Sequence, residues 1–277
     1  MMINTVNTVL NGNLAKKLKH WAESLDKDII SVIVPTYNRS NFLGPLLKTL
    51  NNCILHEKFD VIIIDDGSDD YHGGINAKLH NEYEVNNPFK DIRYIKLDKN
   101  SGTVTIPRNI GISYALGRSI APTDDDCLPK TRKFEQLVNS LWEKDNNILA
   151  FGDREEYHAD TNGDFAHCRT VDCSRFTETK TTIGLDNGQF IYKADIYEWA
   201  PPQFPIYECD WKLYSRFASY GDFVYCGQPV CKYLWHGGNI SRISKAARVN
   251  PLTKLEYYLP YFNEGPFKDA CQSLLNT

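Results

Sequence analysis

Two runs of β-branched and aliphatic residues constrain the fold of this chain more than any other feature. Residues 29–34 read Ile-Ile-Ser-Val-Ile-Val before Pro35, and residues 59–64 read Phe-Asp-Val-Ile-Ile-Ile before Asp65. Such runs are typical of strands buried on both faces of a parallel sheet. A helical repeat of leucines lies between them, at Leu43, Leu46, Leu47 and Leu50. The order strand, helix, strand predicts a right-handed βαβ unit.

The same alternation continues along the chain. Further strands are predicted at residues 92–97, 119–121 and 148–152, and helices at 41–52, 106–116 and 130–145. Residues 153–180 are polar and are expected to be irregular. The sequence therefore predicts an α/β protein with a Rossmann-like mixed sheet flanked by helices.

Helical segments are expected at both ends of this sheet domain. Residues 10–25 carry an apolar stripe at helical spacing with lysines between its members, which favours a helix docked on the main domain; a helix lying on a membrane surface is the alternative. Residues 250–277 hold several aromatic side chains that would pack on the domain or form a homodimer contact. We expect an N-terminal helical extension at 1–28, a main domain at 29–245 and a C-terminal helical tail at 246–277.

Composition narrows the class of protein. The 277 residues are 42% hydrophobic and 24% charged with a net charge of -4, so the chain is of globular type and a nucleic-acid partner is not expected. Eight cysteines lack the spacing of a zinc knuckle, and reduced thiols are expected. Neither a signal peptide nor a membrane-spanning run is predicted. A cytoplasmic protein is the expectation, either soluble or peripheral at the inner membrane face.

Three consecutive carboxylates, Asp124, Asp125 and Asp126, follow the short strand predicted at 119–121. Carboxylates this close repel each other unless a cation is present. Mg²⁺ and Mn²⁺ take oxygen ligands and are commonly held by one or two carboxylates together with substrate phosphates. A solvated acidic turn is the simpler alternative, since aspartate is a common turn residue.

Ligands of open α/β sheets bind at the carboxyl ends of the strands. That rule brings together the acidic triplet, the Asp65-Asp66 pair and the segment Pro35, Thr36, Tyr37, Asn38 and Arg39. An aromatic ring can stack on a base, a carboxylate can accept a hydrogen bond from a base or ribose, and a metal can neutralise phosphates. These side chains suit a nucleotide that carries a diphosphate.

The motifs in this order resemble those of family 2 glycosyltransferases, which have the GT-A fold. The matching segments are residues 31–38, residues 64–68, Asn100-Ser101-Gly102, Arg108-Asn109-Ile110-Gly111 and Asp124-Asp125-Asp126. The resemblance covers about residues 29–242 and implies a nucleotide-binding half at 29–129 and an acceptor-binding half at 130–245. It also implies an inverting sugar transfer from a nucleotide-diphospho-sugar, most simply a UDP-sugar, to a glycan or glycoconjugate hydroxyl, as in polysaccharide biosynthesis.

The resemblance also implies roles for individual residues. Tyr37 would stack on the base, Asp66, or less favourably Asp65, would hydrogen-bond it, and Asp124 would contact the ribose or sugar. Asp126 would ligate Mn²⁺ or Mg²⁺. Arg108 would reach the sugar or a phosphate, with a structural salt bridge as the alternative.

The second half of the chain carries two further matches. Glu208 and Asp210 flank Cys209 where the family has an acidic pair, which makes Asp210 the expected catalytic base and Glu208 the alternative. Residues 234–241 resemble the family's late histidine segment, in which His236 would ligate the metal or touch the diphosphate. Arg242 and Lys245 would then meet the diphosphate from the far side.

Two other functions remain open at this point. A sugar nucleotidyltransferase of the same fold would need a glycine-rich, basic loop for a triphosphate, and residues 35–38 lack both features. A non-catalytic module that binds nucleotide sugars would not need candidates for a metal ligand and a base together. The transferase is therefore the favoured function.

Overall fold

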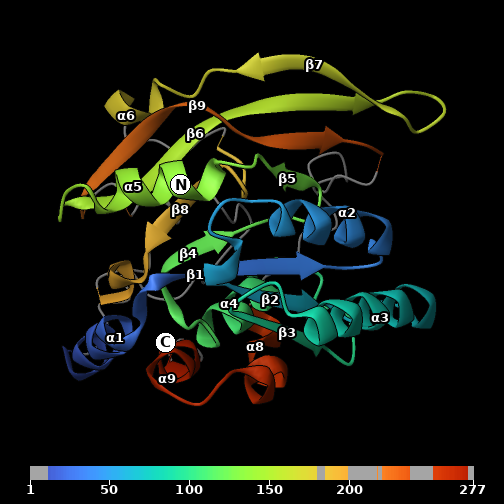
Figure 1. The fold of residues 1–277 in the computed structure, drawn as a ribbon. Helices are drawn as coiled ribbons and strands as arrows, with labels where there is room; N and C mark the ends of the chain where they lie inside the picture. The colour runs from blue at the N-terminus through green and yellow to red at the C-terminus, as the bar shows by residue number, and fades with distance from the viewer. Residues whose placement is uncertain (1–11, 180–184, 199–216, 218–219, 238–251, 274–277) are drawn as a thin grey trace, which may run out of the picture.

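The computed structural model describes residues 12–179, 185–198, 217, 220–237 and 252–273, which form one mixed sheet with helices on both faces (Figure 1). Nine strands of the described residues belong to this sheet, in the order β3-β2-β1-β4-β8-β6-β9-β5, with β7 paired to β6. This arrangement confirms the predicted α/β class. The expected domain boundaries stay a prediction.

The first half of the sheet is parallel. It contains β1 (Asp26–Thr36), β2 (Phe59–Asp65), β3 (Asp91–Lys96) and β4 (Gly117–Pro122). Strand β1 lies between β2 and β4, with Ile33 aligned to Ile62 on one side and to Pro122 on the other. The strand order reverses at β1, and the crevice outside the carboxyl ends of β1 and β4 is where such sheets bind ligands.

The second half mixes directions. Its strands are β5 (Cys127–Pro129), β6 (Asn147–Ala159), β7 (Phe165–Val171), β8 (Phe190–Lys193) and β9 (Asp222–Trp235). β8 runs antiparallel to β4 and β6, β9 runs parallel to β6, and the short β5 pairs antiparallel with β9. This last pairing joins the acidic triplet to the end of β9.

The expectation that residues 153–180 are irregular was wrong. They complete β6 and form β7, a hairpin that extends beyond the rest of the sheet at the top of the view in Figure 1. Its turn is held by the Asp160 side chain, which accepts from the backbone N–H groups of Asn162 and Asp164, with Gly163 at φ +87°. β7 is exposed along most of its length, so it lacks the apolar alternation by which strands are recognised in a sequence. The dipeptide Asn162-Gly163 is the turn signal from which the hairpin could have been predicted.

Helices cover both faces of the sheet. One face packs α1 (Gly12–Ser24), α4 (Thr105–Ser113), α8 (Leu252–Tyr258) and α9 (Pro266–Ser273), and the other packs α2 (Ser40–Asn51), α3 (Asp70–Asn86) and α5 (Lys133–Trp142). Alternate residues of β1 serve the two layers, with Ile33 in the first and Val32 and Val34 in the second. This explains why the run at 29–34 is apolar throughout. The remaining helical segments are short: η1 (His56–Lys58), α6 (Phe176–Thr179), η2 (Ala194–Glu198) and η5 (Leu259–Tyr261).

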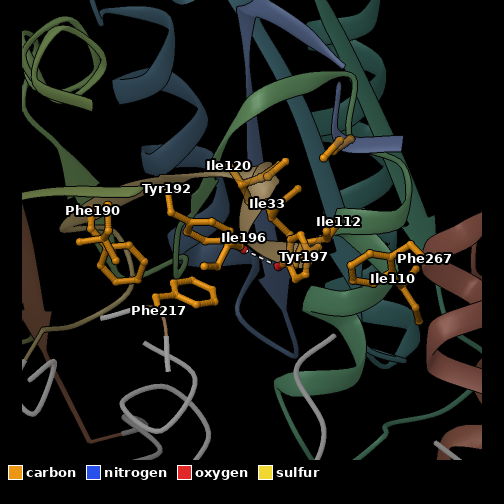
Figure 2. Packing of buried hydrophobic residues seen from close by; sticks show 14 of the residues in the cluster. Ile33, Ile110, Ile112, Ile120, Phe190, Tyr192, Ile196, Tyr197, Phe217 and Phe267 are labelled. Atoms are coloured by element: carbon orange, nitrogen blue, oxygen red, sulfur yellow. Dashed lines mark hydrogen bonds between the residues drawn. The ribbon is translucent and has the colours of Figure 1, made fainter. Parts of the chain in front are cut away.

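The first core layer is rich in aromatic side chains (Figure 2). Tyr192 of β8 and Tyr197 of η2 are buried with their hydroxyl groups 2.7 Å apart, so each phenol is satisfied inside the core. The ring of Tyr197 meets Phe267 of α9 edge-on at 5.1 Å. The core therefore ties the sheet to the C-terminal helices.

Both terminal segments dock on the domain, as the sequence favoured for the N-terminal one; for the C-terminal one it left packing and a homodimer contact open. Leu18 and Ala22 of α1 are fully buried, and Trp21 packs on Phe267 at 5.5 Å between ring centroids. In the described part of the chain, no helix has the length and apolar character needed to cross a bilayer.

Candidate nucleotide and metal site

Three loops meet where β1, β2 and β4 end. They carry the segment after Thr36, the pair Asp65-Asp66, and the acidic triplet Asp124 to Asp126. Their closeness is fixed by hydrogen bonds: the backbone N–H of Asp66 donates to Thr36 O at 2.9 Å, and that of Thr123 donates to Ile33 O at 2.9 Å. The sheet thus brings together the segments that the sequence placed at one edge.

Asp125 is the innermost carboxylate of the triplet, at 2% exposure. It accepts from the Thr36 hydroxyl at 2.8 Å and from Nη1 of Arg39 at 3.0 Å. Burial raises the pKa of its carboxyl to about 7; the adjacent Asp126 carboxylate acts in the same direction, and Arg39 and Thr36 oppose it. Pro35 and Thr36 are buried at the end of β1, and Thr36 reaches the acidic triplet through its hydroxyl.

Arg39 supplies a positive charge to the triplet. The same Nη1 atom that contacts Asp125 lies 3.0 Å from Oδ2 of Asp126, so one guanidinium bridges two carboxylates. The Arg39 side chain is 20% exposed and those of Asp125 and Asp126 only 2% and 5%. A bridge with so little solvent is only weakly screened, and it offsets the repulsion between adjacent aspartates. The sequence grouped Arg39 with nucleotide binding and missed this contact.

Asp126 also meets His236. Its Oδ2 atom lies 3.3 Å from Nε2 of the histidine. The pairing of β5 with β9 produces this contact, since Asp126 O accepts from the Leu234 N–H at 2.9 Å just before His236. The ring of Phe42 stacks on the imidazole with centroids 4.4 Å apart. Both residues expected at the metal therefore lie together, and Phe42, which the sequence did not single out, holds the imidazole in place.

Asp124 points to a different partner. Its Oδ1 atom accepts from Nη2 of Arg108 at 2.7 Å, and the Arg108 side chain is 3% exposed whereas that of Asp124 is 27% exposed. Arg108 lies on α4, which packs beneath the parallel strands. The contact is the salt bridge that the sequence left as an alternative, and it leaves the Asp124 carboxylate at the surface of the site.

Asp65 and Asp66 have separate environments despite being adjacent. Asp65 is buried, and its carboxylate accepts from the backbone N–H of Ser68, from Asn76 Nδ2 and from the Tyr94 hydroxyl at 2.7–2.9 Å. Asn76 lies on α3, Tyr94 lies on β3, and Ser68 lies in the loop between β2 and α3. The Asp65 carboxylate is thus used in holding the fold together, whereas the Asp66 carboxylate faces the loop after β3.

Asp66 is held by the loop after β3. Ser101 donates to it through its backbone N–H at 3.0 Å and through its hydroxyl at 2.9 Å, and Asn100 Nδ2 donates to Oδ2 at 3.0 Å. Asn100 was an expected site residue. Ser101 was not, although it lies inside the Asn100-Ser101-Gly102 motif.

Tyr37 lies at the mouth of this region and is 43% exposed. The next residue, Asn38, has φ +52°, its N–H donates to Ser68 Oγ at 2.9 Å, and its side-chain oxygen accepts from the Asp69 N–H. An exposed ring on a loop fixed in this way is free to take a flat partner on its face. Asn38 itself has a structural task in joining the loops after β1 and β2.

Some expected residues cannot be placed. Glu208, Asp210, Arg242 and Lys245 lie outside the described residues. Residues 185–190 contact the segments on either side of the triplet: the Gly188 N–H donates to Pro122 O at 2.8 Å, and a Cβ on Gly188, which has φ +94°, would fall 2.5 Å from Cys127 Sγ. Only glycine fits this approach.

The residues present suit a divalent cation whose remaining ligands come from the substrate and from water. In the described part of the chain, no group of three or more His, Cys, Asp or Glu side chains is arranged to hold a metal ion. Asp126 and His236 nevertheless offer one carboxylate and one imidazole with Oδ2 and Nε2 3.3 Å apart, and such a donor pair suits a cation whose other ligands are diphosphate oxygens and water.

A solved structure shows the same fold. The structure of Staphylococcus aureus TarS residues 1–349 in complex with UDP-GlcNAc matches with a TM-score of 0.59 at 18% sequence identity, covering 90% of this chain and 71% of that one. The sheet and its crevice therefore define an α/β protein of the GT-A type, as the resemblance implied.

The sequence comparisons give the family. Residues 31–220 match the Glycosyl transferase family 2, so this chain belongs to that family, as the motifs predicted. The poly(ribitol-phosphate) β-N-acetylglucosaminyltransferase TarP of S. aureus is 32% identical over 119 residues, which are 43% of this chain and 34% of TarP. Its counterpart TarS is 30% identical over 171 residues, or 58% of this chain and 26% of TarS. This chain thus spans about a third or less of these relatives' length.

Proposed function

We propose that this chain is an inverting glycosyltransferase that moves a sugar from UDP-GlcNAc, or a closely related UDP-sugar, to a hydroxyl group of a glycoconjugate. The observation that carries the proposal is the convergence of Tyr37, Asp66 and the Asp126–His236 pair at one sheet edge in a family 2 member. UDP-GlcNAc is the donor bound in the related TarS structure. Poly(ribitol-phosphate), the acceptor in the names of TarP and TarS, is the first acceptor to test.

Each residue of the site has a part in donor binding under this proposal. Tyr37 stacks on the uracil ring, Asp66 accepts from the base, and Asp124 accepts from a ribose or sugar hydroxyl. Arg242 and Lys245 meet the diphosphate. Asp126 and His236 would hold the divalent cation that family 2 enzymes typically use, Mn²⁺ or Mg²⁺, and the cation would supply positive charge where negative charge develops on the departing diphosphate.

The transfer itself is a single displacement. The acceptor oxygen forms its bond to the anomeric carbon as the bond from that carbon to the diphosphate breaks, and the configuration inverts. Asp210 takes the proton of the acceptor hydroxyl. UDP leaves with the electron pair of the broken bond.

The test is a transfer assay with a panel of nucleotide sugars, Mn²⁺ and poly(ribitol-phosphate), read as UDP release and as product mass. We expect UDP-GlcNAc to be used and Asp210→Asn to lower kcat by about 10²-fold or more, the usual effect of a positioned base. Glu208→Gln is the matched control and keeps most of the activity. Normal transfer by folded Asp210→Asn would reassign the base, and no turnover of any nucleotide sugar would refute the proposed activity.

A further inference from the structure

The loop between β3 and α4 has an unusual support. Residues 97–104 form no regular structure, yet Asn100 and Ser101 of this loop are the residues that hold the Asp66 carboxylate. Fixing the backbone of a loop residue costs conformational entropy. Contacts from outside the loop are therefore needed to hold Asp66 in one orientation.

Those contacts come from the C-terminal segment. The Tyr258 hydroxyl donates to Lys99 O at 3.1 Å, and the Asp98 N–H donates to the Tyr261 hydroxyl at 3.2 Å. The Lys99 ammonium lies 3.9 Å from the centroid of the Tyr257 ring. Tyrosines at three positions of α8 and η5 thus grip two consecutive residues of the loop.

The segment that carries these tyrosines is itself firmly anchored. Tyr258 is 1% exposed and Phe262 is 2% exposed in the core that also contains α4. The Asn263 N–H donates to Ser113 Oγ at 3.0 Å at the end of α4. The segment that carries the tyrosines is therefore held by the core and by α4, independently of its contacts with the loop.

The loop is also pressed closely against the turn after β2. Gly67 has φ +74°, and a Cβ there would lie 2.3 Å from Lys99 C and 2.5 Å from Asn100 N. Burial raises the pKa of the Tyr258 hydroxyl to about 12, with the nearby Asp66 carboxylate adding to the effect. A shift of the loop would thus move Asp66 directly, because no space lies between the two segments.

We propose that Tyr258 and Tyr261, with Tyr257, are positioning residues of the nucleotide site: they fix the 98–101 loop, and through Asn100 and Ser101 they set the orientation of Asp66. The proposal rests on the proposed function, in which Asp66 binds the base. It makes the C-terminal segment part of donor recognition, although the segment lies about 160 residues further along the chain from the loop. Preorganised contacts raise affinity by removing an ordering cost from the binding step.

The test compares UDP binding by calorimetry, in Mn²⁺, for the full chain and for variants. The double variant Tyr258→Phe/Tyr261→Phe loses both hydroxyl groups and keeps both rings. We expect its Kd for UDP and its KM for UDP-sugar to rise about 5- to 20-fold, the effect of one to two hydrogen bonds, with kcat at saturating donor within about twofold of wild type. Amides of residues 98–101 should exchange hydrogen faster, as followed by mass spectrometry.

Tyr197→Phe is the control. It also removes a hydroxyl from a buried tyrosine, and the hydrogen bond that it breaks is the one between Tyr197 of η2 and Tyr192 of β8. We expect a lower melting temperature with an unchanged Kd. An unchanged Kd in the double variant, or an equal rise of Kd in Tyr197→Phe, would overturn the positioning role while leaving the proposed function intact. Absence of UDP binding by the wild-type chain would overturn both.

Discussion

Asp126 and His236 lie 110 positions apart in sequence, yet Oδ2 of the aspartate is 3.3 Å from Nε2 of the histidine. The antiparallel pairing of β5 with β9 produces this relationship, because the two residues lie just outside paired ends of these strands. One carboxylate and one imidazole so placed are suited to share a cation.

The first prediction concerns this pair. We expect His236→Ala to weaken Mn²⁺ binding in the presence of UDP by at least about tenfold, because a ligand is lost. Electron paramagnetic resonance of free Mn²⁺ measures the effect. His158→Ala is the control, since His158 lies near Trp235 with ring centroids 6.0 Å apart and is not a proposed ligand. Equal Mn²⁺ affinities in the two variants would argue against His236 as a ligand.

The second prediction concerns Arg39. Arg39→Ala leaves the buried Asp125 and Asp126 carboxylates without their shared guanidinium, and we expect the free energy of unfolding to fall by about 3 kcal/mol. Urea unfolding in EDTA measures this loss. Adding Mn²⁺ should restore part of it, since a second cation can take the place of the first. Arg39→Lys keeps the charge and should lose less; a variant as stable as wild type in EDTA would contradict the bridging role.

The third prediction separates Asp65 from Asp66. Asp66→Asn should raise the Kd for UDP about tenfold or more, the scale of a hydrogen bond to a charged group, and should also lower the melting temperature, because Asn100 and Ser101 donate to this carboxylate. Asp65→Asn should lower the melting temperature and leave the Kd near that of wild type, because the Asp65 carboxylate serves Ser68, Asn76 and Tyr94 within the scaffold. Calorimetry and thermal unfolding of both variants give the comparison. The assignment fails if Asp65→Asn is the variant with the larger loss of affinity.

The fourth prediction concerns Lys133, which is fully buried on α5. Its Nζ atom has no hydrogen-bond partner among the residues that the structure describes and lies 4.5 Å from the centroid of the Phe134 ring. Burial lowers the pKa of this ammonium, with the thiols of Cys127, Cys231 and Cys53 acting in the opposite direction. We expect Lys133→Met to raise the free energy of unfolding at pH 7 by about 1–3 kcal/mol, because a buried unpaired group is removed.

The pH dependence follows from the same shift. Between the lowered folded pKa of Lys133 and its unfolded value of 10.5, the unfolded chain binds more protons, so this lysine makes stability rise with pH over that range. Lys133→Met should remove this rise from urea unfolding curves. Arg132→Met, on the exposed neighbour, should keep it. A Lys133→Met variant less stable than wild type would show that the ammonium has a stabilising role.

Much of the parallel half of the sheet was predictable from the sequence. The runs at 29–34 and 59–64 are buried on both faces, and a strand buried in this way is recognised in the sequence by its continuous apolar residues. The grouping of the segments at their ends was predictable too, because parallel strands deliver their carboxyl ends to one edge. That rule and the order of the motifs were enough to place Tyr37, Asp66 and the acidic triplet at the same edge.

The contacts between distant segments were not predictable. The bridging position of Arg39, the stacking of Phe42 on His236 and the grip of Tyr258 on Lys99 depend on tertiary approach, which leaves no periodic signal in the sequence. The hairpin of β6 and β7 was not predicted, for another reason. Its outer strand is exposed along most of its length, so burial imposes no pattern of apolar residues on it.

Thermal unfolding with UDP, with and without Mn²⁺, tests the central claim most directly, namely that Asp126 and His236 hold a divalent cation against a nucleoside diphosphate. The account predicts that UDP raises the melting temperature only when Mn²⁺ is present, and that Asp126→Asn abolishes this rise. A rise of the same size in EDTA, or none in either condition, would contradict it.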